Sequence, residues 1–374
     1  MPIPLNFWEE LFVAPEAQAP AVRIEMRLLK KGGRPFLLLP GQPRPAAATM
    51  DLYPAQTSRG RMARALMRCL LRASLPLGTQ TISLAISPGD PFVKFLSSLT
   101  GEQGWPVLGI FAGNPASDGQ RFLLLVFDAR QRPIAVVKAG LSPRAKALVE
   151  REERFLATVP DKTVAVPRLR ARFESSRLRA LALDFVPGDS PRPREDAAIP
   201  PLLAAWVDAT RTVVLSDTPD WMRLEEVAPA SGSFSVVSGQ LRWRKIHPAM
   251  HQGDFAPWNI KVSPAGAWTV LDWERGELTG IPGWDWFHYV IQPGILVGHL
   301  PILALVQRVE HLLSSAAFRQ YATRGGILGC ERELVLAYLL HVVEVIKPSE
   351  GLAPTRGLLE ALAARWRMGS RPPA

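Results

Sequence analysis

The stretch of residues 251–274, HQGDFAPWNIKVSPAGAWTVLDWE, constrains the fold of this 374-residue chain more than any other segment. It carries the proton- and metal-binding side chains Asp254, Asn259 and Asp272, at intervals of five and thirteen positions. Gly253 allows the backbone to turn just before Asp254, because glycine adopts conformations that other residues avoid. The segment therefore predicts a polar loop, followed by a short strand that leads to Asp272.

This spacing is typical of the catalytic loop of kinases. In that loop an Asp receives the proton of the substrate hydroxyl, an Asn binds one Mg²⁺, and a second Asp binds Mg²⁺ at the phosphates. We therefore interpret Asp254 as the catalytic base, and Asn259 and Asp272 as the metal ligands. The alternative is an ordinary loop in which these side chains form turns with their own backbone.

A kinase also needs a strand Lys that holds the phosphates and a helix Glu that holds this Lys. The run PIAVVK at 133–138 predicts such a strand, although a Lys at a strand end is also typical of an exposed edge. The apolar periodicity of residues 145–159 predicts the helix. We expect Glu152 to be the partner of Lys138 and keep Glu153 as the second candidate; the alternative is that both face solvent.

Two further segments are candidates for nucleotide binding. Strands predicted at 107–112 and 121–128 form a hairpin, and its loop contains Gly113, Asn114 and Ser117. Backbone N–H groups of such a loop can turn toward an anion, but an ordinary surface turn fits equally well.

The second segment is LALDFVPG at 181–188. It predicts an apolar strand that ends in a Pro-Gly turn, with Asp184 and Val186 near that end. Exposed backbone groups there could hydrogen-bond an adenine ring. A core strand that ends in a turn is the alternative interpretation.

Together these motifs resemble the aminoglycoside phosphotransferase and choline kinase-like family, over roughly residues 105–374. The strongest likeness is GDFAPWN followed by LDWE. The resemblance implies a two-lobed, protein-kinase-like α+β fold with an antiparallel β nucleotide lobe and a mainly helical lobe. It implies ATP and Mg²⁺ as cofactors, and transfer of the γ-phosphate to a hydroxyl of an amino sugar, sugar or amino alcohol. It also implies that Asp285 braces the catalytic loop.

One position departs from the family pattern. The family usually has a His two positions before the catalytic Asp, whereas this chain has Gln252 there and His251 one position earlier. The amide of Gln252 can take over a scaffolding role, because it both donates and accepts hydrogen bonds. We expect His251 to be structural. The departure leaves open a second class of function, a non-catalytic nucleotide-binding or scaffold protein on a kinase-like fold.

The positive charge of the chain is concentrated near its start. Residues 21–80 contain eleven Arg and Lys but two acidic residues, and the whole chain has a net charge of +10. Arginines at helical spacing predict a helix that begins near Thr57 or Ser58. Its predicted apolar face consists of Met62, Leu66, Cys69 and Leu70. Either this face packs on the domain, or the basic region binds an anionic ligand or a membrane surface. Nucleic acid is a further, less favoured partner, because aromatic residues do not alternate with the arginines as they do in sites for single-stranded nucleic acid.

The motifs divide the chain into three parts. Residues 1–104 form a basic extension, 105–187 a β-rich nucleotide lobe, and 188–374 a helical lobe that carries the catalytic loop. The extension, with strands at 34–39 and 81–86, is either a small α/β domain or an addition to the nucleotide lobe. Helices of the last part are predicted at 200–215, 301–322, 331–347 and 355–367.

The sequence also indicates where the protein works. Two cysteines are too few for a disulfide framework, which fits a reducing compartment. The start of the chain lacks the basic-then-apolar order of a secretory signal, and we see no apolar run long enough to span a membrane. We therefore expect a cytoplasmic enzyme.

Overall fold

The computed structural model divides into two compact units. The sheet unit comprises residues 1–157 and 166–187, and the helical unit comprises residues 158–165 and 188–374. The structure describes residues 7–13, 22–31, 33–53, 55–75, 79–87, 89–101, 105–113, 119–160, 166–228, 232–348 and 350–366.

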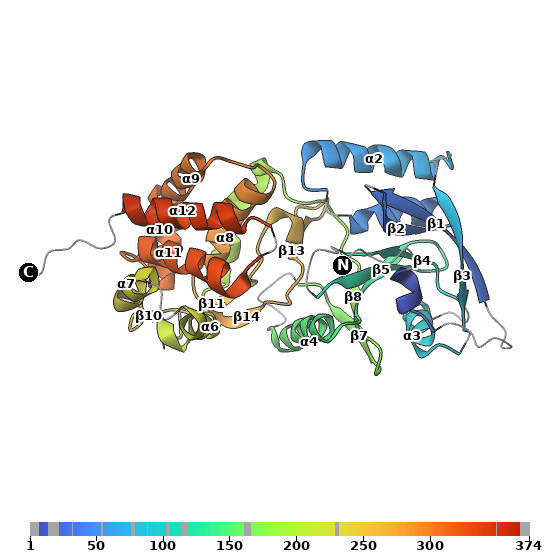
Figure 1. Ribbon diagram of the computed structural model, residues 1–374, viewed down its shortest axis with the longest axis horizontal. Coiled ribbons are helices and arrows are strands. Elements are labelled where there is room, and N and C mark those ends of the chain that lie inside the picture. Colours follow the sequence, from blue (N-terminus) through green and yellow to red (C-terminus); the bar gives the residue numbers. More distant parts are fainter. Residues whose placement is uncertain are drawn as a thin grey trace, which may run out of the picture. The chain divides into compact units, whose positions relative to one another are not determined.

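The sheet unit is built on one eight-stranded sheet whose paired strands are all antiparallel (Figure 1). Its strands are β1 (Val22–Lys31), β2 (Arg34–Pro40), β3 (Gln80–Ile86), β4 (Leu108–Phe111), β5 (Arg121–Phe127), β6 (Pro133–Gly140), β7 (Leu169–Glu174) and β8 (Arg179–Asp184). They lie in the order β3, β1, β2, β4, β5, β6, β8, β7. The antiparallel sheet expected from the sequence is confirmed.

Both faces of this sheet are covered, which explains the unbroken apolar runs of its central strands. Side chains alternate between faces along a strand. Leu38 and Leu124 belong to the core on one face, which includes Phe92 of α3 (Pro91–Thr100). Leu37 and Leu125 belong to the core on the other face, which includes Ala46 of α1 (Pro43–Thr49). A strand buried on both sides needs apolar residues at every position, not at alternate ones.

The first hundred residues contribute to the same sheet. Strand β1 pairs with β3 from Val22 opposite Ile86 to Leu28 opposite Gln80, and β2 pairs with β4. Of the two alternatives for this region, the structure shows the addition to the sheet. The sequence patterns above do not predict β1, although Ile24 and Met26 alternate with charged residues.

The helical unit contains the helices α5 (Ile199–Ala205), α6 (Pro219–Val227), α7 (Gly232–Leu241), α8 (Trp284–Leu296), α9 (Ile302–Ser314), α10 (Ala316–Gly325), α11 (Glu331–His341) and α12 (Leu352–Arg365). Three two-stranded sheets accompany them: β9 (Val213–Val214) with β10 (Lys245–Ile246), β11 (Ala249–His251) with β14 (Glu277–Gly280), and β12 (Ile260–Val262) with β13 (Trp268–Val270). The expectation of a mainly helical second part is confirmed. No helix among the described residues is long and apolar enough to cross a membrane.

Two of the predicted helices are wrong in extent. The helix expected at 200–215 ends at Ala205, because Trp206 accepts a hydrogen bond from Met250 N–H and Val207 forms a β-bridge with Ala249. The helix expected at 301–322 is two helices, since the Ser315 side chain caps the start of α10 by accepting from Phe318 N–H.

The arginine-rich helix packs on α1, but the apolar face that we expected to be buried is wrong. Helix α2 (Ser58–Arg72) begins where expected, with the Thr57 side chain accepting from Gly60 N–H. However, Met62 is 73% exposed and Leu66 is 61% exposed. The buried side of α2 carries Leu71 instead, because contacts of two arginines with the preceding turn fix the helix in the opposite orientation.

Candidate functional site

The sheet unit brings the predicted pair Lys138 and Glu152 into contact. Lys138 is on β6, and its Nζ lies 2.7 Å from both carboxylate oxygens of Glu152. Glu152 is on α4 (Pro143–Thr158), between the buried apolar residues Val149 and Phe155 of the same helix. Glu152 is fully buried and Lys138 is 8% exposed. Two buried opposite charges at this distance stabilise each other, whereas either one alone would be costly.

The neighbouring candidate Glu153 has different partners. Its Oε1 lies 3.0 Å from Arg172 on β7, and its Oε2 lies 3.1 Å from Arg179 on β8. Adjacent positions on a helix point about 100° apart, so only one of the two glutamates can face β6. The geometry therefore favours Glu152 as the partner of Lys138.

The other nucleotide-binding candidates of the sheet unit are only partly described. Asn114 and Ser117 lie outside the described residues. Gly113 has a φ of +72°, a conformation that suits glycine. Asp184 ends β8 and forms an ion pair with Arg170 at 2.8 Å. Val186 follows as a half-buried residue. Their roles at a nucleotide remain predictions.

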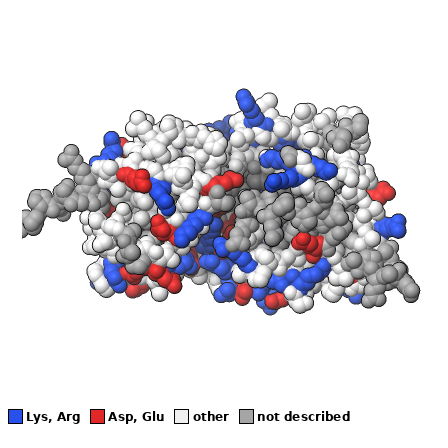
Figure 2. Space-filling view, in the orientation of Figure 1, with Lys and Arg blue, Asp and Glu red and all other residues white. Residues whose placement is uncertain are grey.

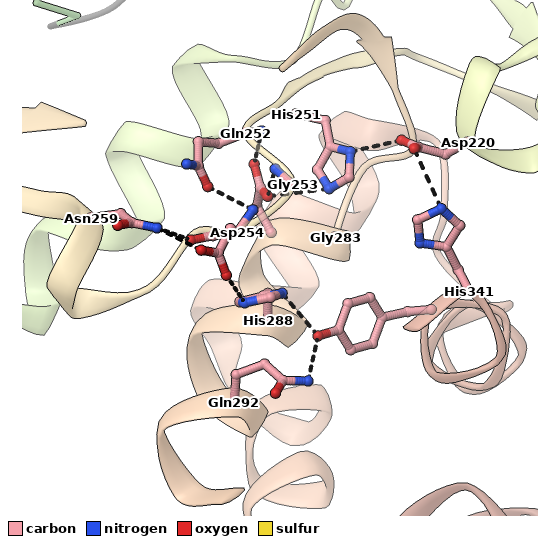
Figure 3. Close-up of polar contacts among 12 residues, drawn as sticks. Asp220, His251, Gln252, Gly253, Asp254, Asn259, Gly283, His288, Gln292 and His341 are labelled. Carbon is pink, nitrogen blue, oxygen red and sulfur yellow. Dashed lines mark hydrogen bonds and ion pairs between the residues drawn. The ribbon is translucent and has the colours of Figure 1, made fainter. Parts of the chain in front are cut away.

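In the helical unit, the carboxylate of Asp254 is held by Asn259 (Figure 3). The Asn259 side-chain nitrogen donates to Asp254 Oδ2 at 2.8 Å and to the Asp254 carbonyl at 2.9 Å. An amide nitrogen does not bind cations. If Asn259 is a metal ligand, its Oδ1 is therefore the atom that binds, and the two hydrogen bonds determine where that atom points.

The hairpin of β12 and β13 brings Asn259 and Asp272 to one end. Asn259 immediately precedes β12, and Asp272 follows β13 after Leu271. Leu271 N–H donates to the Asn259 carbonyl at 2.7 Å, which extends the antiparallel pairing. Asp272 has a φ of +63°, an uncommon conformation that Asp tolerates better than most residues.

This donor set suits Mg²⁺. Magnesium takes oxygen ligands, commonly one or two carboxylates together with substrate phosphates and water. Asp272 supplies a carboxylate and Asn259 an amide oxygen. Among the residues that the structure describes, no group of three or more His, Cys, Asp or Glu is arranged to hold a metal ion.

Gln252 links the two acidic residues of the loop. Its Oε1 accepts from Asp254 N–H at 2.7 Å, and its Nε2 donates to the carbonyls of Leu271 at 3.0 Å and Asp272 at 2.7 Å. The side chain is fully buried. Because one partner is a donor and two are acceptors, the network requires an amide in one orientation. Gln252 thus has the scaffolding position that we expected.

Asp285, near the start of α8, holds the backbone of the same loop. Its Oδ2 accepts from Gln252 N–H at 2.7 Å and its Oδ1 from Gly253 N–H at 3.0 Å. Gly253 has a φ of +83°, and a Cβ there would lie 2.7 Å from Arg275 Cβ. Burial raises the pKa of Asp285. The contacts match the bracing role that the resemblance implies.

His251 lies between two buried carboxylates. Its Nδ1 is 2.7 Å from Asp220 Oδ2, and its Nε2 is 3.2 Å from Asp285 Oδ1. Burial alone would lower the pKa of His251, but Asp285 and Asp220 together raise it to about 9. Burial would likewise raise the pKa of Asp220, yet the charge and hydrogen bond of His251 lower it. His251 is therefore a charged structural residue near neutral pH.

Sequence reasoning did not find His288 of α8. Its Nε2 lies 3.0 Å from Asp254 Oδ1, without the angle of a hydrogen bond. Its Nδ1 is 3.1 Å from Tyr338 Oη, which accepts from Gln292 Nε2 at 3.3 Å. A signal was present: His288 is three positions after Asp285, so both side chains share one helix face.

Comparison by sequence finds no matching protein-family model and no matching curated protein. The structure is similar to aminoglycoside phosphotransferase APH(4)-Ia, with a TM-score of 0.44, 14% identity, and coverage of 74% of this chain and 98% of that one. It is also similar to APH(3'')-Id from Streptomyces rimosus ATCC10970, with a TM-score of 0.39, 14% identity, and coverage of 71% and 98%. Both names belong to the family that the motifs resemble. Identities this low specify neither substrate nor activity.

Proposed function

We propose that the protein is an ATP-dependent phosphotransferase that moves the γ-phosphate to a hydroxyl group of a small molecule. The observation that carries this proposal is a hydrogen-bonded network. The amide of Gln252 connects the backbones of Asp254 and Asp272, and the Asn259 side chain donates to the Asp254 carboxylate. A loop whose Asp and Asn side chains served only local turns would not need a buried residue that ties both acidic positions together.

Each side chain has a role that suits its surroundings. The Asp254 side chain is 33% exposed, so an acceptor hydroxyl can reach it, and the carboxylate can orient that hydroxyl and take its proton. Asn259 and Asp272 would hold Mg²⁺, which neutralises charge on the phosphates when bound. Lys138, directed by Glu152, would bind the phosphates.

We propose an amino sugar, a sugar or an amino alcohol as the acceptor, the classes that the sequence resemblance implies. Only twelve residues separate Asp272 from Asp285, which leaves little room for the activation segment and peptide platform of a protein kinase. A small acceptor is therefore favoured over a protein substrate.

Thermal unfolding with and without Mg-ATP tests the nucleotide site. At about 100 times the dissociation constant, binding stabilises a protein by about 2.7 kcal/mol, which raises Tm by roughly 3–4 °C at this size. We expect a Mg²⁺-dependent rise in the wild type and none in Asp272→Ala. Asp254→Ala should keep most of the rise, because Asn259 keeps its hydrogen bond to the carbonyl of residue 254. It should reduce phosphoryl transfer by at least about a hundredfold, because the proton acceptor is removed.

Each outcome separates the two classes of function. A rise in Tm without transfer to any acceptor class would favour the non-catalytic nucleotide-binding protein. If neither ATP nor GTP raises the Tm of the wild type, both the phosphotransferase and the non-catalytic nucleotide-binding protein are refuted. If Asp254→Ala loses the rise and the transfer together, Asp254 is not a dedicated base.

A further inference from the structure

Helix α2 turns an apolar stripe away from the protein. Met62, Leu66 and Cys69 are exposed, and Leu75, just beyond the helix, is 47% exposed. At 100° per residue, Met62, Leu66 and Cys69 lie within one narrow sector of the helix. Large apolar side chains scattered singly on a surface are normal, but a continuous stripe on one helix marks an interaction site.

The outward orientation of this stripe is fixed by contacts on the other side of the helix. Arg68 forms an ion pair with Asp51 at 2.8 Å, and Arg64 donates to the Tyr53 carbonyl at 3.2 Å. Leu71 is fully buried. Helix α2 packs on α1, and α1 packs on the sheet, so α2 is the outer layer of its unit (Figure 1). The stripe cannot turn inward without breaking these contacts.

Arginines border the stripe on both sides. Arg61 and Arg72 lie on one side of it and Arg59 on the other, and all three are exposed. Helix α2 contains no acidic residue. In Figure 2 the surface along α2 is mostly uncharged, with Lys and Arg side chains beside it. An apolar sector between cationic borders is the pattern of a helix that lies in the plane of a membrane interface.

We propose that α2 binds the surface of an anionic lipid bilayer. Met62, Leu66 and Cys69 enter the boundary between headgroups and acyl chains, while the long side chains of Arg59 and Arg72 reach the lipid phosphates. A second copy of the chain is a poorer occupant, because two such faces would bring their arginine borders together. A free anion would use the arginines but would leave the apolar stripe uncovered.

Vesicle flotation of the full-length protein tests the proposal. The vesicles contain either phosphatidylcholine alone or phosphatidylcholine with about 30% phosphatidylglycerol, a composition chosen to give a strongly anionic surface. We expect binding to the anionic vesicles and little to the neutral ones. Met62→Ser with Leu66→Ser should weaken that binding at least tenfold, because it removes the apolar contact. Arg59→Gln with Arg72→Gln should weaken it about fivefold for each charge removed.

A matched control separates α2 from exposed apolar residues in general. Met222→Ser with Leu303→Ser removes two residues that are 58% and 65% exposed on other helices, and its binding should equal that of the wild type. Circular dichroism verifies that each variant is folded. The proposal is overturned if the wild type does not bind anionic vesicles, or if the Met62 and Leu66 variant binds as well as the control. A dimer that dissociates in that variant, without vesicle binding, would assign the stripe to a second copy.

Discussion

Gln252 accepts from one backbone donor and donates to two backbone acceptors, and these three bonds connect Asp254 to Asp272. A carboxylate of the same shape could keep the first bond but not the other two. Its charge would be buried against the carbonyl oxygens of Leu271 and Asp272. At this position, therefore, the amide group matters more than the size of the side chain.

We expect Gln252→Glu to reduce turnover by at least about a hundredfold and to lower the unfolding free energy by about 2–3 kcal/mol, because buried acceptors lose their donors. Gln240→Glu, an exposed change of the same type in the helical unit, should alter neither. Phosphoryl-transfer rates and urea unfolding measure both effects. Wild-type turnover in Gln252→Glu would show that this amide does not organise the loop.

Several residues of the site can be predicted from sequence because their spacing is local. Asp254, Asn259 and Asp272 lie within one loop and one hairpin, so the chain itself sets their separation. Lys138 and Glu152 are linked by a strand and a helix whose periodicity is clear. His288 contacts Asp254 from 34 positions away. Its spacing from Asp285 places it on the same helix face, but that spacing alone does not identify Asp254 as its partner.

At the scale of elements, the pairing of β6 with α4 depends on one glutamate of two. Glu152 faces Lys138, whereas Glu153 faces Arg172 and Arg179. The adjacent positions allow two roles of α4 to be tested separately. One is holding Lys138, for which we propose phosphate binding, and the other is anchoring the helix to β7 and β8.

We expect Glu152→Gln to raise the dissociation constant for Mg-ATP at least about tenfold, because Lys138 loses the charge that directs it. Glu153→Gln should leave that constant unchanged and lower stability by about 1 kcal/mol, since Arg172 is largely exposed and Arg179 keeps its ion pair with Glu150. Calorimetric titration and thermal unfolding give the two quantities. Equal losses of affinity in both variants would contradict the assignment of Glu152.

The elements themselves were predictable to different degrees. Strands such as β5 and β6 have apolar runs that identify them, and α2 begins where its arginine spacing predicts. The direction in which α2 packs was not predictable. Its periodicity defines two faces, but the contacts with Asp51 and Tyr53 decide which one is buried. The same limit applies to β1, because its place in the sheet depends on pairing with β3, more than fifty positions away.

At the scale of the whole molecule, a buried charge network joins four elements of the helical unit. It comprises Asp220 of α6, His251 of β11, Asp285 of α8 and His341 of α11. Burial lowers the pKa of His341 to about 4, so this histidine is neutral near pH 7 while His251 is charged. Their pKa shifts have opposite signs and should give opposite dependences of stability on pH.

The charge on His251 stabilises the fold below its unfolded pKa of about 6.5, and this stability is lost as pH rises through the folded pKa of about 9. For His341 the folded pKa is the lower one, so stability increases from about pH 4 to 6.5.

We expect the unfolding free energy to be greatest near pH 6.5 and to decrease by about 3 kcal/mol by pH 9. Urea unfolding followed by Trp fluorescence measures this, since nine of the eleven Trp lie in residues 188–374. His311→Gln, which removes an exposed histidine, should keep the decrease, whereas His251→Gln should flatten it even if that variant is less stable overall. An equally steep decrease in both variants would mean that another group titrates in this range and that His251 is not the charged centre of the network.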